Sequence, residues 1–181
     1  MSEPLGKLDR AETAALIVET LAEQGIDVVL VGGSCVCVWT DERFGSLDLD
    51  FVDISYAKRK QIANALAKIG YLPEGKTRYF THPDSKWSIE FPSAPLAVGH
   101  EAIASVRIAS LQTRVGKIRL LNPTDTIKDR LLWWYLEGDR QCWEQALDIA
   151  RNHSVDWRNL QRWHGSEGHA DRFAGFRDSA R

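Results

Sequence analysis

The sequence predicts an α/β (α+β) fold, with a mixed sheet flanked by helices and followed by a helical C-terminal part. Up to residue 121, short apolar runs rich in β-branched residues alternate with helix-length amphipathic segments, which indicates alternating strands and helices. From residue 123 onward the apolar residues recur with helical spacing. Of the 181 residues, 44% are hydrophobic and 27% are charged, which is enough apolar material for an ordinary globular core.

The change of pattern near residue 122 sets the expected domain organisation. We expect an α/β core at residues 1–122, a C-terminal helical segment at 123–164 and a flexible tail at 165–181, where glycine, serine, histidine and charge are mixed. Five of the seven tryptophans lie between Trp133 and Trp163. Aromatic packing between helices is the favoured interpretation of this cluster, and a base-stacking surface is the alternative.

Charge and cysteine content exclude several classes of protein. The formal net charge is −2 and the pI is about 6.2, so the totals give no drive toward nucleic acid. Three cysteines are too few for a disulfide framework or a structural zinc site, and we interpret them as small buried hydrophobes in a reducing cytosol. No signal core is present at the N-terminus, and no apolar run reaches the length of about 18 residues that a membrane span needs. We therefore expect a cytoplasmic protein that does not contact a membrane.

The elements expected in the first half follow from glycine stops and apolar periodicity. They are a helix at 10–24, a strand at 26–31, a helix at 34–41, a strand at 46–52 and a helix at 55–69. Gly25 and Gly70 end the first and last of these helices, and Ser55 is the expected N-cap of the last. The helix at 34–41 begins at a glycine turn, so its first amides would face whatever binds there.

The second half continues with strands and then changes to helices. The expected elements are strands at 77–81, 87–91 and 106–111, a hairpin that pairs 108–112 with 117–121, and helices that begin near Thr124, Asp139 and Val155. Thr124 is the expected N-cap of the first of these helices, and Gly138 is its expected end.

Two carboxylates on the strand at 46–52 carry the strongest chemical signal. Asp48 and Asp50 are separated by one residue, so their side chains point to the same face of the sheet. Two adjacent negative charges repel each other unless a cation lies between them. Carboxylate oxygens suit Mg²⁺, which in such sites usually accompanies the phosphates of a nucleotide.

A third acid has the same phase on a neighbouring strand. In the strand at 87–91 the apolar residues alternate with Glu90, as the apolar residues of the strand at 46–52 alternate with Asp48 and Asp50. If these two strands pair with their apolar faces together, all three acids emerge on one side, where they could hold two Mg²⁺ ions. The alternative is that Glu90 is a solvent-facing residue on a half-exposed strand.

These acids and the glycine turn together form a known combination of motifs. The two motifs read Val31-Gly32-Gly33-Ser34 and, after residues 35–47, Asp48-Leu49-Asp50-Phe51, with Arg43 and Ser46 just before the acids. This combination resembles the DNA polymerase β-like nucleotidyltransferases, particularly their minimal, uncharacterised bacterial members, over about residues 26–91. The segment 122–131 looks like the helix that follows the core in those members.

The resemblance implies a role for each matching residue. The implied catalytic and metal-binding set is Asp48, Asp50 and Glu90, although the family more often has aspartate at the third position. The implied nucleotide-binding set is Gly32, Gly33, Ser34, Arg43 and Lys128. For Lys128 the alternative is a solvated helix lysine, paired with Asp125 or Asp129. The implied cofactor is Mg²⁺, with two ions possible, and the implied substrate is a nucleoside triphosphate.

The expected function is Mg²⁺-dependent transfer of a nucleoside monophosphate from a nucleoside triphosphate to a hydroxyl group on a protein, RNA or small molecule. A protein or small-molecule acceptor is favoured over nucleic acid because the chain is short and slightly acidic. The alternative is a non-catalytic nucleotide-binding or antitoxin-like regulatory protein, which acts through a partner such as a toxin-like protein. An unrelated α/β domain with chance matches to both motifs is a third interpretation.

Overall fold

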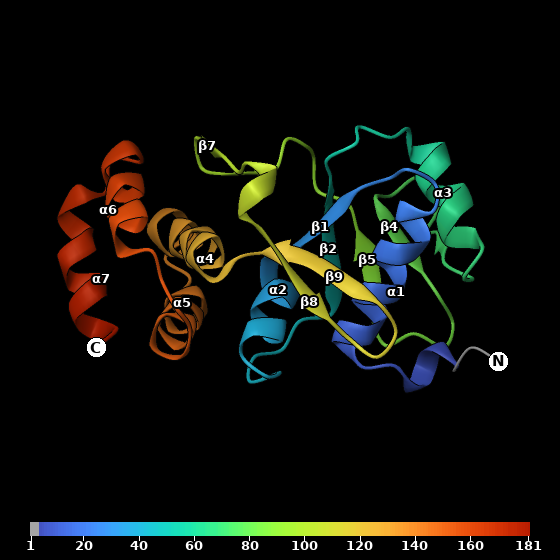
Figure 1. The fold of residues 1–181 in the computed structure, drawn as a ribbon, viewed down its shortest axis with the longest axis horizontal. Coiled ribbons are helices and arrows are strands. Elements are labelled where there is room, and N and C mark those ends of the chain that lie inside the picture. Colours follow the sequence, from blue (N-terminus) through green and yellow to red (C-terminus); the bar gives the residue numbers. More distant parts are fainter. Residues whose placement is uncertain (1–3) are drawn as a thin grey trace.

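The sheet at the centre of the molecule contains seven strands, in a computed structural model that describes residues 4–181 (Figure 1). Its strands are β1 (Val28–Val31), β2 (Asp48–Asp53), β3 (Leu72–Pro73), β4 (Tyr79–Thr81), β5 (Ser88–Glu90), β8 (Ile108–Gln112) and β9 (Lys117–Leu121). They lie in the order β3-β4-β5-β2-β1-β9-β8, and a separate hairpin is formed by β6 (Ala97–Val98) and β7 (Glu101–Ala102). The sheet contains both parallel and antiparallel pairs, so the predicted fold class is confirmed.

The strand β2 lies in the middle of this sheet, between β1 and β5. It runs antiparallel to β1 and parallel to β5, with Leu49 opposite Ile89 and Asp50 opposite Glu90. Leu49, Phe51 and Ile89 are fully buried. Because side chains alternate along a strand, the acidic side chains share the opposite face, as the phase of the two strands predicts.

The helices lie close to the predicted positions, except that one begins four residues later than predicted and the last was not predicted. They are α1 (Arg10–Ala22), α2 (Gly32–Trp39), α3 (Arg59–Ala67), α4 (Pro123–Glu137), α5 (Arg140–Asn152), α6 (Trp157–Ser166) and α7 (Phe173–Ser179), with short 3₁₀ turns η1 (Leu5–Lys7), η2 (Ser105–Arg107) and η3 (Ala170–Arg172). A capping box begins α1, in which the side chains of Asp9 and Glu12 each accept a hydrogen bond from the backbone amide of the other. The helices α1 and α3 pack against each other beside the sheet (Figure 1).

The helix α4 leaves the sheet at the end of β9 and opens the helical part at one end of the molecule (Figure 1). The predicted N-cap was Thr124, but the structure has Asn122 in this position. Pro123 occupies the first helical position and fixes the cap at the residue before it. Gly138 ends α4 with φ of 69°, in the left-handed region. The helix α5 packs along α4, and α2 contacts both, so the glycine turn at the start of α2 is tied to the helical part.

Ser55 does not cap α3, which is a second departure from prediction. The Asp53 carboxylate accepts hydrogen bonds from the backbone amides of Ser55 and Ala57, at 2.8 and 2.6 Å. These bonds hold the segment after β2 in a turn, and α3 begins only at Arg59.

Residues 165–181 do not form the loose tail expected from their composition. They contain η3 and α7, and Phe173 and Phe176 are buried. The ring of Phe176 lies 5.4 Å from that of Trp143 and 6.2 Å from that of Trp157, measured between centroids. Two phenylalanines three residues apart give a short helix one apolar face, and this face outweighs the polar composition around it.

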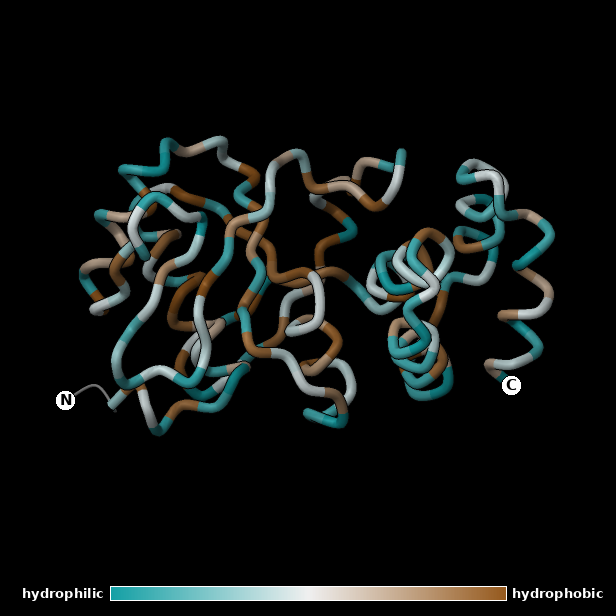
Figure 2. Tube along the Cα trace, turned by 180° about the vertical axis from the view of Figure 1, so that it is seen from behind, coloured by the Kyte–Doolittle hydropathy of each residue, from teal (hydrophilic) through white to brown (hydrophobic). Residues whose placement is uncertain are grey.

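Apolar segments are concentrated in the strands at the middle of the molecule, and the outer helices show polar stretches toward solvent (Figure 2). All three cysteines are free and buried, as interpreted from the sequence. Across residues 4–181, no helix combines the length and the apolar character of a membrane-spanning segment.

Candidate active site

A row of residues across three neighbouring strands brings the two predicted motifs together. Val31, the last residue of β1, lies opposite Asp50 of β2, which in turn lies opposite Glu90 of β5. Adjacent strands are about 4.8 Å apart, so the glycine turn that follows Val31 and both acids occupy one small region. Asp48 lies two residues away along β2, about 7 Å from Asp50 along the strand.

The glycine turn is in direct contact with the Asp50 carboxylate. Gly32 has φ of 65°, and a Cβ atom at this position would lie only 2.6 Å from Asp50 Oδ2. A Cβ atom on Gly33 would lie 3.2 Å from the hydroxyl oxygen of Ser46. Gly32 is therefore required both for the backbone conformation and for the close approach of the acid to the first turn of α2.

The surroundings of Asp50 disfavour its negative charge. Burial is the largest cause, and the negative charges of Glu90 and Asp48 add to it, so that the pKa of Asp50 is raised from 3.8 to about 7. The positive charge of Arg130 opposes this shift only in part. Near neutral pH the carboxyl group thus binds either a proton or a cation that relieves the repulsion.

The other two acids already have partners. Arg78 forms an ion pair with Glu90, and the Ser88 hydroxyl donates a hydrogen bond to Asp48 Oδ1 at 2.8 Å. Within the part of the chain that the structure describes, no group of three or more His, Cys, Asp or Glu side chains is arranged to hold a metal ion. The acids therefore do not form a complete three-ligand site. Their oxygens fit a cation such as Mg²⁺, which takes most of its ligands from water and substrate phosphates.

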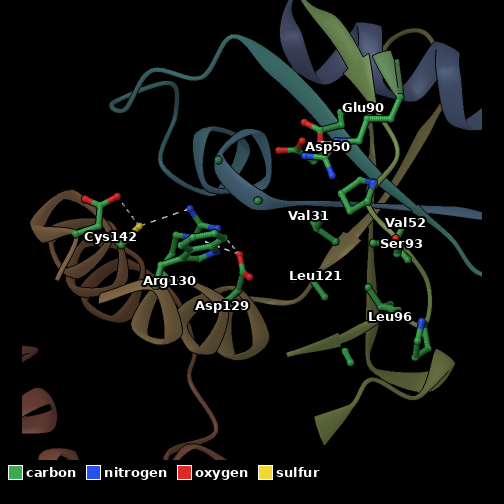
Figure 3. Close-up of a pocket in the computed structure, with 18 residues that line it drawn as sticks. Val31, Asp50, Val52, Glu90, Ser93, Leu96, Leu121, Asp129, Arg130 and Cys142 are labelled. Atoms are coloured by element: carbon green, nitrogen blue, oxygen red, sulfur yellow. Dashed lines mark hydrogen bonds and ion pairs between the residues drawn. The ribbon is translucent and has the colours of Figure 1, made fainter. Parts of the chain in front are cut away.

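A cavity of about 600 Å³ lies against this row, between the sheet and the helical part. The residues lining its sheet side include Gly32, Gly33, Asp50, Arg78 and Glu90. Those on its helical side are Asp129, Arg130, Trp133, Asp139 and Cys142. Figure 3 shows Asp50 and Glu90 together on the first side and Arg130, Asp129 and Cys142 across from them. Its volume is in the range typical of small-molecule sites.

Arg130 is a cavity residue that sequence reasoning missed. Its guanidinium group donates to Asp129 Oδ2 from Nη2 at 2.5 Å and from Nε at 3.1 Å. Burial is the largest single influence and disfavours its charge, but the charge and hydrogen bonds of Asp129, together with Cys142 and Cys35, outweigh burial, and the pKa of Arg130 is raised. Helix geometry could have found it, because Asp129, Arg130 and Trp133 fall on one face of α4, whereas Lys128 falls on another.

Ser34 and Arg43 do not point into the cavity, although both were predicted to bind the nucleotide. The fully buried Ser34 hydroxyl accepts a hydrogen bond from Arg10 Nη1 at 2.7 Å and donates one to the backbone carbonyl of Asp48. It thus supports the strand that carries the acids. Arg43 forms an ion pair with Asp148 of α5.

Lys128 is also directed away from the cavity. Its side chain is fully buried, with Nζ 2.7 Å from Glu101 Oε2 and 3.1 Å from Asp125 Oδ1. Arg107 forms ion pairs with the same two acids. The lysine is therefore neither solvated nor placed to reach a phosphate, because it belongs to a buried ionic cluster that joins the β6–β7 hairpin to α4.

Comparison with known proteins identifies the fold. No protein-family model matches the sequence, and no curated protein matches it either. Among solved structures, an antigenic nucleotidyltransferase-like protein from Paracoccidioides brasiliensis superposes with a TM-score of 0.61. The match covers 97% of this chain and 95% of that one, at 13% sequence identity. The chain has a nucleotidyltransferase-like fold.

Two further structures superpose less well. Both are of ANT(2'')-Ia, one in complex with adenylyl-2''-tobramycin and one a solution structure of this antibiotic-resistance factor. Their TM-scores are 0.49 and 0.48, each at 14% identity over 90% of this chain and 93% or 88% of the other. A likeness this distant transfers neither a substrate nor an activity to this chain.

Proposed function

We propose that the protein is a Mg²⁺-dependent nucleotidyltransferase that transfers a nucleoside monophosphate from a nucleoside triphosphate to a hydroxyl group. The observation that carries the proposal is the row formed by the glycine turn, Asp50 and Glu90 at the wall of the cavity. The nucleotidyltransferase-like fold supports it. At Gly32 the turn has no room for a side chain next to Asp50, and the charge of Asp50 is repelled by Glu90 and Asp48. This arrangement suits a phosphate together with its cation.

Different residues around the cavity would bind the triphosphate and the divalent cation. Amides at Gly32 and Gly33, at the N-terminus of α2, would face the triphosphate. Asp48 and Asp50 would hold a divalent cation, which neutralises phosphate charge and favours attack by the acceptor. Glu90 lies beside Asp50 and would complete this arrangement once Arg78 releases it.

Arg130 would supply positive charge from the opposite wall, in place of Arg43 and Lys128, the two basic side chains predicted from the sequence. It lines the cavity and is held in position by Asp129. In this assignment Ser34 and Arg10 are positioning residues, because they hold the Asp48 backbone.

The proposed reaction needs no nucleophile from the protein. The acceptor hydroxyl oxygen forms a bond to the α-phosphorus, and the bond from that phosphorus to the bridging oxygen of the β-phosphate breaks. Pyrophosphate leaves with the electron pair, and the hydroxyl proton passes to water. A cavity of about 600 Å³ leaves room beside a triphosphate for a small molecule or for one residue of a protein. We therefore favour these acceptors over nucleic acid.

Transfer of label tests the proposal. The purified protein is incubated with each α-labelled nucleoside triphosphate and Mg²⁺, with and without cell lysate, beside an Asp48→Asn, Asp50→Asn double variant. An Asp27→Asn variant is the matched control, because the Asp27 side chain is exposed and forms an ion pair with Arg119, away from the cavity lining. Label transferred by the wild type and the control, and not by the double variant, supports the proposal. Failure of the wild type both to transfer label and to bind nucleotide contradicts it.

A non-catalytic nucleotide-binding role is the second candidate, and the Glu90–Arg78 ion pair favours it. With Glu90 engaged by Arg78, the acids offer fewer free oxygens than two cations require. Such a protein would bind a nucleotide and act through a protein partner, such as a toxin. Mg²⁺-dependent nucleotide binding without transfer, in the wild type and in an Arg78→Ala variant, would favour this role.

A further inference from the structure

Trp133 is a large apolar side chain that the fold leaves half exposed. It lies on α4 and lines the cavity, with 51% of its surface accessible. An exposed tryptophan forgoes the stabilisation that burial of its large apolar surface would provide. Other apolar side chains are exposed too, such as Leu136 on the same helix, but Trp133 is distinguished by its place at the wall of the cavity.

The neighbouring tryptophan shows that packing was available to the helix. Trp134 lies with its ring 5.9 Å from that of Trp143, and Trp143 in turn packs against Phe176. The aromatic core of the helical part is thus formed without Trp133. Because Trp133 follows Arg130 by three residues, it shares the face of α4 that looks into the cavity.

The distribution of polar groups determines which part of a nucleotide would reach this tryptophan. The glycine turn and the acids lie on the sheet side, where the triphosphate and its cation would bind. The wall opposite the glycine turn and the acids is formed by α4 and α5, and the segment 92–97 forms a further side of the cavity. A nucleotide that extends straight across the cavity from the glycine turn would reach α4. On that wall the carboxylates of Asp129 and Asp139 are already engaged, by Arg130 and by the amide of Gln141.

We propose that Trp133 is the stacking platform for the nucleobase of the bound nucleoside triphosphate. The proposal rests on the proposed function, because it places the base relative to phosphates at the glycine turn. Stacking on an indole ring suits every base, since each base has a π face. With the nearby carboxylates engaged, this wall offers little to distinguish one base from another. We therefore expect all four nucleotides to bind with similar affinity, and purines to bind somewhat more tightly because they overlap more of the ring.

Comparison of a nucleotide with its bare phosphate chain isolates the contribution of the base. We would measure the dissociation constants of ATP, UTP and inorganic tripolyphosphate by calorimetry in Mg²⁺, for the wild type and for Trp133→Ala, Trp133→Phe and Trp134→Phe variants. Loss of a stacked base contact weakens binding by about 5- to 150-fold. Trp133→Ala should weaken ATP and UTP by a factor in this range and leave tripolyphosphate unchanged. Trp133→Phe should retain most of the affinity, and Trp134→Phe should retain all of it.

The other outcomes overturn the proposal in distinguishable ways. Unchanged ATP binding by Trp133→Ala means that the ring does not stack on the base. Equal weakening of ATP and tripolyphosphate by Trp133→Ala, with an unchanged melting temperature, means that the residue acts on the phosphates. Failure of the wild type to bind either ligand rejects the proposed function itself, and the base platform with it.

Discussion

Replacement of Asp50 by asparagine should stabilise the protein in the absence of ligand. The pKa of Asp50 is raised from 3.8 to about 7, first by burial and then by the charges of Glu90 and Asp48. One pKa unit corresponds to 1.36 kcal/mol, so the shift amounts to at most about 4 kcal/mol of unfavourable free energy for the ionised form. Because structural relaxation and solvent reduce this figure, we expect a gain of about 2–4 kcal/mol in the free energy of unfolding at pH 8.

Because the pKa of Asp50 is raised and not lowered, the wild type loses stability as the pH increases, within a defined pH range. An acid with a raised pKa in the folded state binds its proton more tightly there than in the unfolded chain. The wild type therefore loses stability as the pH rises from about 4 to about 7, and above that window the loss is complete. The asparagine variant lacks this titration, so its advantage should be absent below pH 4 and full at pH 8.

Chemical denaturation at a series of pH values measures this difference. For a chain of this length, a gain of 2–4 kcal/mol corresponds to an increase of about 5–15 °C in the melting temperature. Asp27→Asn is the control, since its side chain is 59% exposed. Addition of Mg²⁺ and a nucleoside triphosphate should reverse the order, because a ligand that binds only the wild type stabilises only the wild type.

One result would refute this reasoning directly. If Asp50→Asn and the wild type have parallel stability curves between pH 4 and pH 8, the carboxyl group is not under electrostatic stress. The case for a cation at this position would then lose its physical basis, even if the fold is correct.

Two further predictions test the glycine turn and the C-terminal helix. Gly32→Ala should abolish Mg²⁺-dependent nucleotide binding, measured by calorimetry, because its Cβ atom would collide with the Asp50 carboxylate. The control Gly25→Ala also has a positive φ, of 70°, but within residues 4–181 nothing lies within 4 Å of the added atom, so it should lose only about 1–2 kcal/mol of stability on denaturation and keep binding. Phe176→Ala should destabilise the protein by about 3–5 kcal/mol in urea denaturation, whereas the exposed control Asp178→Ala should change little; equal effects would restore the view that residues 165–181 are loosely held.

The alternation of side chains made the shared face of the acidic row predictable from the sequence, but not the order of the strands or the short strands β3, β6 and β7. Period-2 patterns fix which face each side chain takes, so the positions of Asp50 and Glu90 followed once their strands were assumed to pair. The helix cap at Asn122 was missed because two capping residues flank Pro123 and the choice between them depends on the proline.

The lysine and arginine side chains of the site could not be predicted in the same way. A motif match places a residue along the chain, but the direction of a lysine or arginine side chain depends on acids supplied by distant elements. Glu101, on the β6–β7 hairpin, draws Lys128 into a buried ionic cluster, and Asp148 of α5 draws Arg43 to the helical part. Arg130 faces the cavity because Asp129 holds it there.

The geometry of the acidic row argues for a ligand on energetic grounds. The pairing of β2 with β5 is held by buried apolar residues on the other face, including Leu49 and Ile89, so the acids cannot move apart without loss of that packing. The close contact with Gly32 prevents the Asp50 carboxylate from moving toward the start of α2. Asp50 can then be relieved only by a proton or by a cation. A sheet that fixes like charges side by side at the wall of a cavity is stable with that cation bound, and less stable without it.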